Sequence, residues 1–257
     1  MIAPLNTVAG RAALLEQRGG LTVLRPPGPG PFPVVLQLHG CAGPQPFQKV
    51  YAQAAVNAGA AVVIVDSFRP RGMSRLDGSL FVCTGATLRG AQRAGDLFGV
   101  LHWLERQPWA DPRRIAAAGW SHGGWTIMDA MALGPAAPRA TGLIDADPAI
   151  LRRLKATFLV YPYAAFPSLT SSRGWGAARP GVFALLCGRD QVVGVKHPQQ
   201  ALERLSRDGL TVDTLLFPDA THAFDDDDAN DPRTRYRVDL REQAVRYYVG
   251  ALRKAFG

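Results

Sequence analysis

The sequence predicts an α/β fold in which a mostly parallel, doubly wound sheet is flanked by helices. Apolar runs such as residues 34–38 and 61–65 have the length and composition of buried parallel strands. Longer segments with helical periodicity separate these runs, and such alternation is typical of βαβ units. Of the 257 residues, 47% are hydrophobic, which is enough for one large core. Since no repeat or linker divides the chain, we expect a single domain over residues 1–257.

Each element of this fold follows from local patterning. Strands are expected where short apolar runs stand between turn residues: 21–24, 34–38, 61–66, 115–118, 157–161, 182–186 and 211–217. Helices are expected where apolar residues recur at helical spacing: 47–58, 86–106, 125–133, 198–207 and 235–255. The lead-in is expected to be amphipathic or irregular, and the loops are rich in Pro, Gly and Asp: 1–20, 26–31, 67–84, 134–150 and 162–180.

Charge and composition exclude several classes of function. The net charge of +8 comes from scattered arginines with no basic stripe interleaved with aromatics, so the sequence does not favour nucleic-acid binding. No apolar run approaches the roughly 18 residues that cross a bilayer. Residues 1–20 lack the long apolar segment of a signal peptide. We therefore expect a cytoplasmic monomer or homodimer that acts on a small molecule, with no membrane partner.

The three cysteines, Cys41, Cys83 and Cys187, show neither metal-ligand spacing nor a CxxC pair. An odd count argues against a full disulfide framework. We expect mostly buried free thiols, with a single bridge between Cys41 and Cys83 as the alternative.

The centre of the chain carries the pattern G-x-S-x-G around Ser121. A buried strand precedes the pattern and a helix follows it, which is the context of a nucleophile elbow. Such a turn strains the serine backbone and brings the flanking positions together, so Gly119 and Gly123 fit where side chains would clash. The helix that follows points its N-terminal amides at the site. A glycine-rich turn with an incidental serine is the structural alternative.

A serine hydroxyl is a poor nucleophile near neutral pH and needs a base, which in turn needs an acid to orient it. In a parallel sheet these residues should follow the carboxyl ends of strands. His222 follows the last expected strand, and Asp190 follows the strand over 182–186 through a Gly-x-Asp turn. The predicted catalytic residues are therefore Ser121, Asp190 and His222, in the chain order of α/β-hydrolases.

Other residues fit these roles less well. The remaining histidines precede the serine, adjoin it or belong to helices: His39, His122, His102 and His197. Asp219 lies three residues from His222 in one loop, which rarely gives the opposed geometry that a triad needs. The structural alternatives are an Asx turn or helix cap for Asp190 and a solvated loop side chain for His222.

Two backbone amides are expected to bind the oxyanion of the reaction. One should be the N–H of His122, next to the nucleophile. The other should come from the loop after residues 34–38, where Cys41 is our choice because Gly40 lets the backbone approach closely. A nucleophilic role for Cys41 itself is disfavoured, because no helix start and no base is placed for it.

Several segments together resemble the dienelactone hydrolase family of α/β-hydrolases, over about residues 20–255: 38–43, 65–72, 119–124, 188–190 and 221–224. The resemblance implies a sheet core with little or no cap domain, and hydrolysis of esters or lactones without metal or cofactor. Dienelactone hydrolases carry cysteine at the nucleophile position, where this chain has Ser121. The chain is therefore more similar to serine esterases and peptidase-like members of the broader group.

Clues to the substrate are fewer. Arg69 and Arg71 follow a central strand and are candidates for binding a substrate carboxylate. The structural alternative is that the two arginines hold their long loop together. Trp175, in an irregular stretch, is predicted to line the pocket, whereas Trp125 is expected to pack in the core. The acidic run over residues 225–228 does not have EF-hand spacing and is predicted to be a solvated loop.

The leading hypothesis is a serine hydrolase that cleaves carboxylic esters or lactones through an acyl-enzyme intermediate. A peptidase or acyltransferase with the same triad is the alternative of similar chemistry. A non-catalytic homologue of the same fold is the alternative of a different class.

Overall fold

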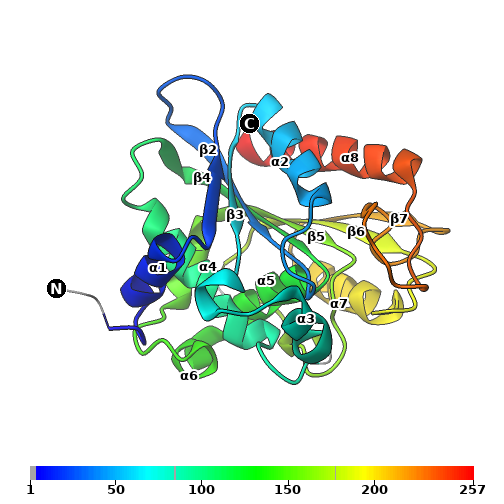
Figure 1. Ribbon diagram of the computed structural model, residues 1–257, viewed down its shortest axis with the longest axis horizontal. Helices are drawn as coiled ribbons and strands as arrows, with labels where there is room; N and C mark the ends of the chain where they lie inside the picture. The colour runs from blue at the N-terminus through cyan, green and yellow to red at the C-terminus, as the bar shows by residue number, and fades with distance from the viewer. Residues whose placement is uncertain (1–3, 84, 177) are drawn as a thin grey trace.

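The computed structural model describes residues 4–83, 85–176 and 178–257. Residues 1–3, 84 and 177, which belong to the predicted lead-in and loops, lie outside the described residues. A seven-stranded sheet with strand order β1-β3-β2-β4-β5-β6-β7 forms the centre (Figure 1). Only β1 runs antiparallel to its neighbour, and the other pairs are parallel. The predicted fold class is confirmed.

The strands and helices lie close to the predicted segments. The strands are β1 Leu21–Leu24, β2 Phe32–Leu38, β3 Ala61–Val65, β4 Ala110–Trp120, β5 Leu154–Val160, β6 Gly181–Cys187 and β7 Val212–Phe217. The longer helices are α1 Val8–Gln17, α2 Phe47–Asn57, α4 Gly90–Leu104, α5 His122–Ala132, α7 Lys196–Arg207 and α8 Val238–Phe256. The short ones are η1 Arg69–Arg71, α3 Arg75–Asp77, η2 Gly78–Val82, η3 Gly134–Ala136, α6 Ala137–Thr141, η4 Pro148–Arg153 and η5 Leu169–Ser171.

Two segments contain more helical structure than the sequence predicted. The lead-in contains α1, whose first turn is capped by the Thr7 side chain accepting from the Gly10 amide. The segment predicted as a loop at 67–84 contains three short helical turns, and a Ser74–Asp77 capping box starts the second of them. Such local hydrogen bonds order a segment without any periodic hydrophobic pattern, so the pattern alone did not reveal them.

Both faces of the sheet are covered, as the continuous apolar strands predicted. One core cluster joins alternate strand residues such as Leu36 to α1, α4, α5 and α7. The other joins the intervening residues such as Val35 to α2 and α8. In Figure 1, α2 and α8 lie together on one side of the sheet, and α1, α4, α5 and α7 lie on the other. Because all strands except β1 run parallel, their carboxyl ends lie at one edge of the sheet. The loops that follow them carry the predicted site residues.

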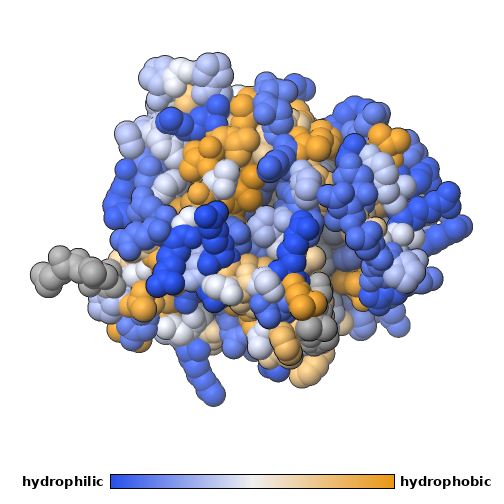
Figure 2. All heavy atoms as spheres, viewed as in Figure 1, coloured by the Kyte–Doolittle hydropathy of each residue, from blue (hydrophilic) through white to orange (hydrophobic). Residues whose placement is uncertain are grey.

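Figure 2 shows hydrophilic residues over most of one face, with smaller hydrophobic areas between them. Among the described residues, no helix combines the length and apolar character needed to cross a membrane.

Candidate active site

The turn between β4 and α5 holds Ser121 in an unusual backbone conformation. Its φ is 51° and its ψ is −110°, a region that non-glycine residues rarely adopt. An added Cβ at Gly119 would come within 2.4 Å of the Gly123 carbonyl carbon, and one at Gly123 within 2.1 Å of the Leu38 oxygen. Close backbone packing therefore requires glycine at both positions, as the sequence pattern predicted.

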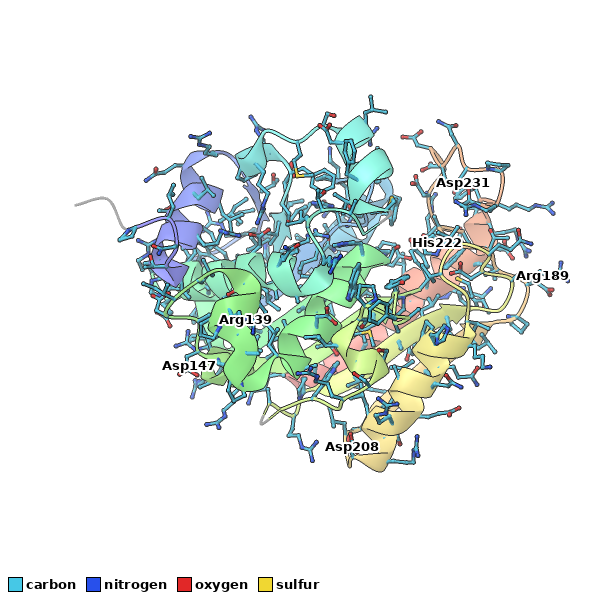
Figure 3. All side chains as sticks on the ribbon, turned by 90° about the horizontal axis from the view of Figure 1, so that it is seen from below. Arg139, Asp147, Arg189, Asp208, His222 and Asp231 are labelled. Atoms are coloured by element: carbon cyan, nitrogen blue, oxygen red, sulfur yellow. A yellow bond between two sulfur atoms is a disulfide. The ribbon has the colours of Figure 1, made fainter. Side chains whose placement is uncertain are left out.

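The three predicted catalytic side chains come together at the strand-end edge. Ser121 Oγ lies 3.0 Å from Nε2 of His222, and Nδ1 of His222 lies 2.7 Å from Oδ2 of Asp190. Since a carboxylate only accepts, Nδ1 carries the proton that is donated to Asp190, and Nε2 is free to accept the serine proton. Figure 3 shows His222 among the loops after the last two strands, with Arg189 and Asp231 on the outer side of the same loops.

Asp190 combines both roles considered for it. Its Oδ2 accepts from His222, while its Oδ1 accepts from the amides of Val192 and Val193, each at 2.9 Å. Burial disfavours the charged carboxylate, but the hydrogen bonds from His222, Val193 and Val192 outweigh it and lower the pKa of Asp190. The rival Asp219 is mostly exposed and pairs with Arg189 at 2.8 Å.

A buried carboxylate supports the loop of His222. The His222 ring packs on Tyr161, with 4.6 Å between ring centroids. The hydroxyls of Tyr161 and Tyr51 both donate to Asp225 at 2.7 Å. Asp225 is fully buried, and burial raises the pKa of its carboxyl group. The prediction of a solvated acidic loop over residues 225–228 was therefore wrong for Asp225, where two aromatic hydroxyls take the place of water, and for Asp226, which is also buried.

The two residues whose amides were predicted to bind the oxyanion both lie at the serine pocket. Cys41 and His122 line the same pocket as Ser121. Among the residues described, neither backbone N–H of this pair donates a hydrogen bond to another protein group. The Gly40 carbonyl is held by the His39 ring, at 2.6 Å from Nδ1. Because a trans peptide points its C=O and N–H in opposite directions, this contact turns the Cys41 N–H away from the His39 ring.

Two histidines near the serine are structural and neutral. His39 is buried, and its Nε2 accepts from the Ser67 amide at 3.1 Å. Burial lowers the pKa of His39 well below its ordinary value, and the positive charge of Arg93 lowers it further. The same two causes lower the pKa of His122 to about 3. Neither ring therefore competes with His222 as the base.

The cysteine expectation was wrong for two of the three residues. Cys41 and Cys83 form a disulfide, while Cys187 is free and buried. The short helical turns after β3 bring Cys83 back to the loop after β2, a proximity that residue spacing does not reveal. The bridge belongs to the wall of the serine pocket, so it ties the backbone of Cys41 to the segment after η2.

The two arginines proposed for substrate binding lie outside the serine pocket. The Arg71 guanidinium forms two hydrogen bonds with the fully buried Asp96, at 2.8 and 2.9 Å, and one with the Ser67 carbonyl. The exposed Arg69 side chain lies beside Gly19, where an added Cβ would come within 3.2 Å of it. Neither arginine lines the serine pocket, and the contacts of Arg71 with Ser67 and Asp96 match the structural alternative, in which the arginine ties its loop to the core.

The pocket wall contains a different tryptophan from the predicted one. Trp175 packs in the core cluster that includes α5 and does not line the pocket. The irregular stretch around it folds back onto the end of α5, where the Gly176 amide donates to the Met131 carbonyl. Trp125 lines the pocket instead, next to Tyr163 at 4.9 Å between ring centroids. The pocket has a volume of about 110 Å³ and is lined by Cys41, Val82, Cys83, Gly85, Ser121, His122, Trp125, Tyr163, Pro167, Val192 and Val193.

A second and larger hollow lies on the other side of the segment after η2. It has a volume of about 640 Å³, and its lining includes Arg11, Arg71 and Arg139. None of Ser121, Asp190 and His222 lines it, so size does not identify the reactive site here. Among the described residues, no group of three or more His, Cys, Asp or Glu side chains is arranged to hold a metal ion.

Asp129 on α5 supports the pocket wall, and sequence reasoning missed it. Its carboxylate accepts from Trp125 Nε1 at 2.7 Å, from the Leu169 amide at 2.7 Å and from Ser168 Oγ at 3.0 Å. The spacing of Trp125 and Asp129, one helical turn apart, was the only signal for this contact in the sequence. Burial raises the pKa of Asp129 to about 6, against the three hydrogen bonds, which favour the charged form.

The raised pKa of Asp129 predicts a pH-dependent stability. The unfolded chain loses this proton near the ordinary value of 3.8, and the folded chain loses it only near 6. The contribution is therefore complete below about 4 and is lost as the pH rises through about 6, on the order of 2–3 kcal/mol. Urea unfolding of wild type and Asp129→Asn should show wild type losing stability relative to the variant between pH 4 and pH 7. Parallel pH curves for the two proteins would contradict this.

The disulfide predicts a loss of stability and rate on reduction. Cys83→Ser should lower the free energy of unfolding by about 2–4 kcal/mol. Because the freed Cys41 backbone loses its anchor, the turnover of a cleaved substrate should also fall, and dithiothreitol should lower it in wild type but not further in Cys83→Ser. The matched control is Cys187→Ala, which should respond to dithiothreitol as wild type does. A fully reduced wild-type protein with unchanged turnover would refute the anchoring role.

Comparison with known proteins supports the fold. A family model described as the prolyl oligopeptidase family matches residues 47–139. No curated protein matches the chain. A candidate dienelactone hydrolase from Klebsiella pneumoniae has 16% identity and a TM-score of 0.68, over 91% of this chain and 92% of that one.

Two further solved structures have similar scores. A dienelactone hydrolase-like promiscuous phosphotriesterase from metagenomic libraries has 17% identity and a TM-score of 0.70, over 93% of this chain and 100% of that one. Esterase 2 of Thermogutta terrifontis, phosphoramylated by tabun, has 14% identity and a TM-score of 0.64, over 91% of this chain and 88% of that one. The chain therefore has the α/β-hydrolase fold, and the resemblance to dienelactone hydrolases drawn from its motifs is confirmed at the level of that fold.

Proposed function

We propose that this chain is a serine hydrolase that cleaves carboxylic esters or lactones through an acyl-enzyme intermediate. The observation that carries the proposal is the series of hydrogen bonds from Ser121 through His222 to Asp190, of 3.0 and 2.7 Å. The neighbours in fold, which include dienelactone hydrolase-like proteins and an esterase, support the same class. Catalytic roles for these residues require all three groups in this order, which an incidental serine would not show.

The first half-reaction follows from the geometry. Nε2 of His222 takes the hydroxyl proton as Ser121 Oγ forms a bond with the carbonyl carbon, and the carbonyl π electrons move onto oxygen. The N–H groups of Cys41 and His122 donate to that oxyanion, and Asp190 stabilises the imidazolium through Nδ1–H. When the carbonyl re-forms, the bond to the alcohol oxygen breaks and the alcohol leaves with the proton from Nε2.

The second half-reaction repeats these steps with water. His222 takes a proton from water as its oxygen attacks the acyl carbon, and the same two amides stabilise the second oxyanion. Collapse breaks the bond to Ser121 Oγ, which receives the proton back from His222. The acid product leaves and the serine hydroxyl is restored.

The pocket favours small and uncharged acyl groups. Its volume is about 110 Å³, and no Asp, Glu, Lys or Arg is among the described residues that line it. A carboxylate placed there would lose its water without gaining a charged partner. With Arg69 and Arg71 directed elsewhere, we infer that the substrate is a neutral ester or lactone with a short acyl chain.

A peptidase is the second candidate, because the family model that matches residues 47–139 is that of the prolyl oligopeptidases. That matched region contains Ser121 and ends before Asp190 and His222, so it does not reach two of the three catalytic candidates. Cleavage of a peptide p-nitroanilide at a rate comparable to that of p-nitrophenyl acetate would favour the peptidase.

We also propose that the protein works in an oxidising compartment. This proposal replaces the cytoplasmic location that we expected from the sequence. The Cys41–Cys83 bridge supports this, because cytosolic reductants keep most protein thiols reduced, and Cys83 is exposed. Protein isolated from its source and denatured in excess iodoacetamide should carry one carbamidomethyl group by mass, on Cys187. Three such groups would indicate a reducing compartment.

Loss of the serine hydroxyl should abolish activity. Ser121→Ala should lower kcat for p-nitrophenyl acetate by at least about a thousandfold, because the nucleophile is gone. A fluorophosphonate probe should label wild type and not the variant. The matched control is Ser206→Ala, an exposed serine on α7, which should keep full activity. A Ser121→Ala protein with wild-type activity would refute the proposed mechanism.

The pocket predicts selectivity by acyl length and charge. From p-nitrophenyl butyrate to the octanoate, kcat/KM should fall by about tenfold or more, because the longer chain does not fit. A hemisuccinate ester should be slower than the butyrate, because its carboxylate is desolvated. Tyr163→Ala should raise kcat/KM for the octanoate ester. Tyr163→Phe, which keeps the ring, should leave that kcat/KM unchanged. Equal rates across the series would refute the assignment of this pocket to the acyl group.

A further inference from the structure

Arg93 on α4 is a buried cation behind the serine pocket. The residue is fully buried. Its Nη1 donates to the His39 carbonyl at 2.7 Å and lies 3.2 Å from Nδ1 of His122, and its Nε donates to Ser67 Oγ at 2.8 Å. One guanidinium therefore reaches three segments that are far apart in sequence.

Two of these contacts concern the backbone that would bind the oxyanion. His39 begins the loop of Cys41, which supplies one proposed amide, and His122 supplies the other. These amides follow different strands, β2 and β4. A single nitrogen, Nη1 of Arg93, contacts both His39 and His122, so it sets the distance between the two loops.

The charge on Arg93 persists at neutral pH. Burial lowers the pKa of Arg93 to about 10, while the carboxylate of Asp96 favours the charged form. The imidazoles of His39 and His122 are neutral, because burial and the Arg93 charge lower the pKa of each. Nδ1 of His122 therefore accepts from Arg93.

The partners of Arg93 are unusual for an arginine with a purely structural role. Asp96, one turn further along α4, forms its ion pairs with Arg11 and Arg71. Among the described residues, Arg93 makes no ion pair with a carboxylate, and its Nη2 has no hydrogen-bond partner. A buried charge is costly unless paired, so its placement against a carbonyl and an imidazole calls for a further role.

We propose that Arg93 is a positioning residue for the oxyanion hole, which holds the amides of Cys41 and His122 in register and favours negative charge between them. This inference rests on the proposed function. The positive charge lies in a low-dielectric interior, where its effect on a developing oxyanion is stronger than in water. The ground-state ester is neutral, so Arg93 should act on the transition state and not on substrate binding.

The test compares Arg93→Met with Arg11→Met. Methionine keeps much of the apolar bulk without the charge. The control removes another arginine that neighbours Asp96 but contacts neither His39 nor His122. For Arg93→Met we expect kcat for p-nitrophenyl acetate to fall by about tenfold to a hundredfold with KM within about twofold, the scale of a damaged oxyanion hole. Arg11→Met should lose stability but keep kcat.

Inhibitor pairs separate positioning from general damage. A short alkyl trifluoromethyl ketone adds to the serine and forms an oxyanion, whereas the matching methyl ketone mimics only the neutral substrate. Arg93→Met should weaken binding of the trifluoromethyl ketone in proportion to the loss of kcat. The affinity for the methyl ketone should stay unchanged. If Arg93→Met does not fold, Arg93→Lys keeps the charge but cannot bridge both loops, and its kcat should fall with KM unchanged.

The failure of this inference differs from failure of the proposed function. An active wild type whose folded Arg93 variants keep kcat and trifluoromethyl ketone affinity within about twofold overturns the role of Arg93 alone. A kcat loss in Arg11→Met equal to that in Arg93→Met also overturns it. A wild-type protein that cleaves no ester and forms no trifluoromethyl ketone adduct overturns both proposals.

Discussion

The tight turn at Ser121 is the constraint on which the rest of the site depends. It joins β4 to α5 with so little space that the two flanking glycines touch each other and the end of β2. The strained serine backbone projects the hydroxyl from the strand-end edge and leaves the first amide of α5 beside it. Everything else in the site is placed relative to this turn, because β4 lies at the centre of the sheet.

Around the turn, buried polar groups hold each reactive part from behind. Asp225, with two tyrosine hydroxyls, supports the loop of His222. Asp129 fixes the tryptophan of the pocket wall. Arg93 and the disulfide of Cys41 contact the two loops whose amides we propose bind the oxyanion. Buried polar side chains such as Asp225, Asp129 and Arg93 are expensive to bury, and each contacts a segment that lines or supports the site.

Much of the fold and the three catalytic candidates could be predicted from the sequence, because both follow from local rules. Apolar runs mark parallel strands, and parallel strands bring Ser121, Asp190 and His222 to one edge. The errors about the site concern pairings between distant side chains. Nothing local indicates that Arg71 pairs with Asp96 on α4, or that Cys83 returns to Cys41. Likewise, the burial of Asp225 depends on tyrosines from α2 and the end of β5.

The most direct measurement of the central claim is the mass of the protein trapped during turnover. Wild type mixed with p-nitrophenyl acetate and quenched in acid within milliseconds should carry one acetyl group, and peptide mapping should place it on Ser121. His222→Ala should show no such adduct on the same timescale, because the hydroxyl keeps its proton. Hydrolysis of the ester with no covalent adduct at Ser121, or with the acetyl group on another residue, would contradict the account.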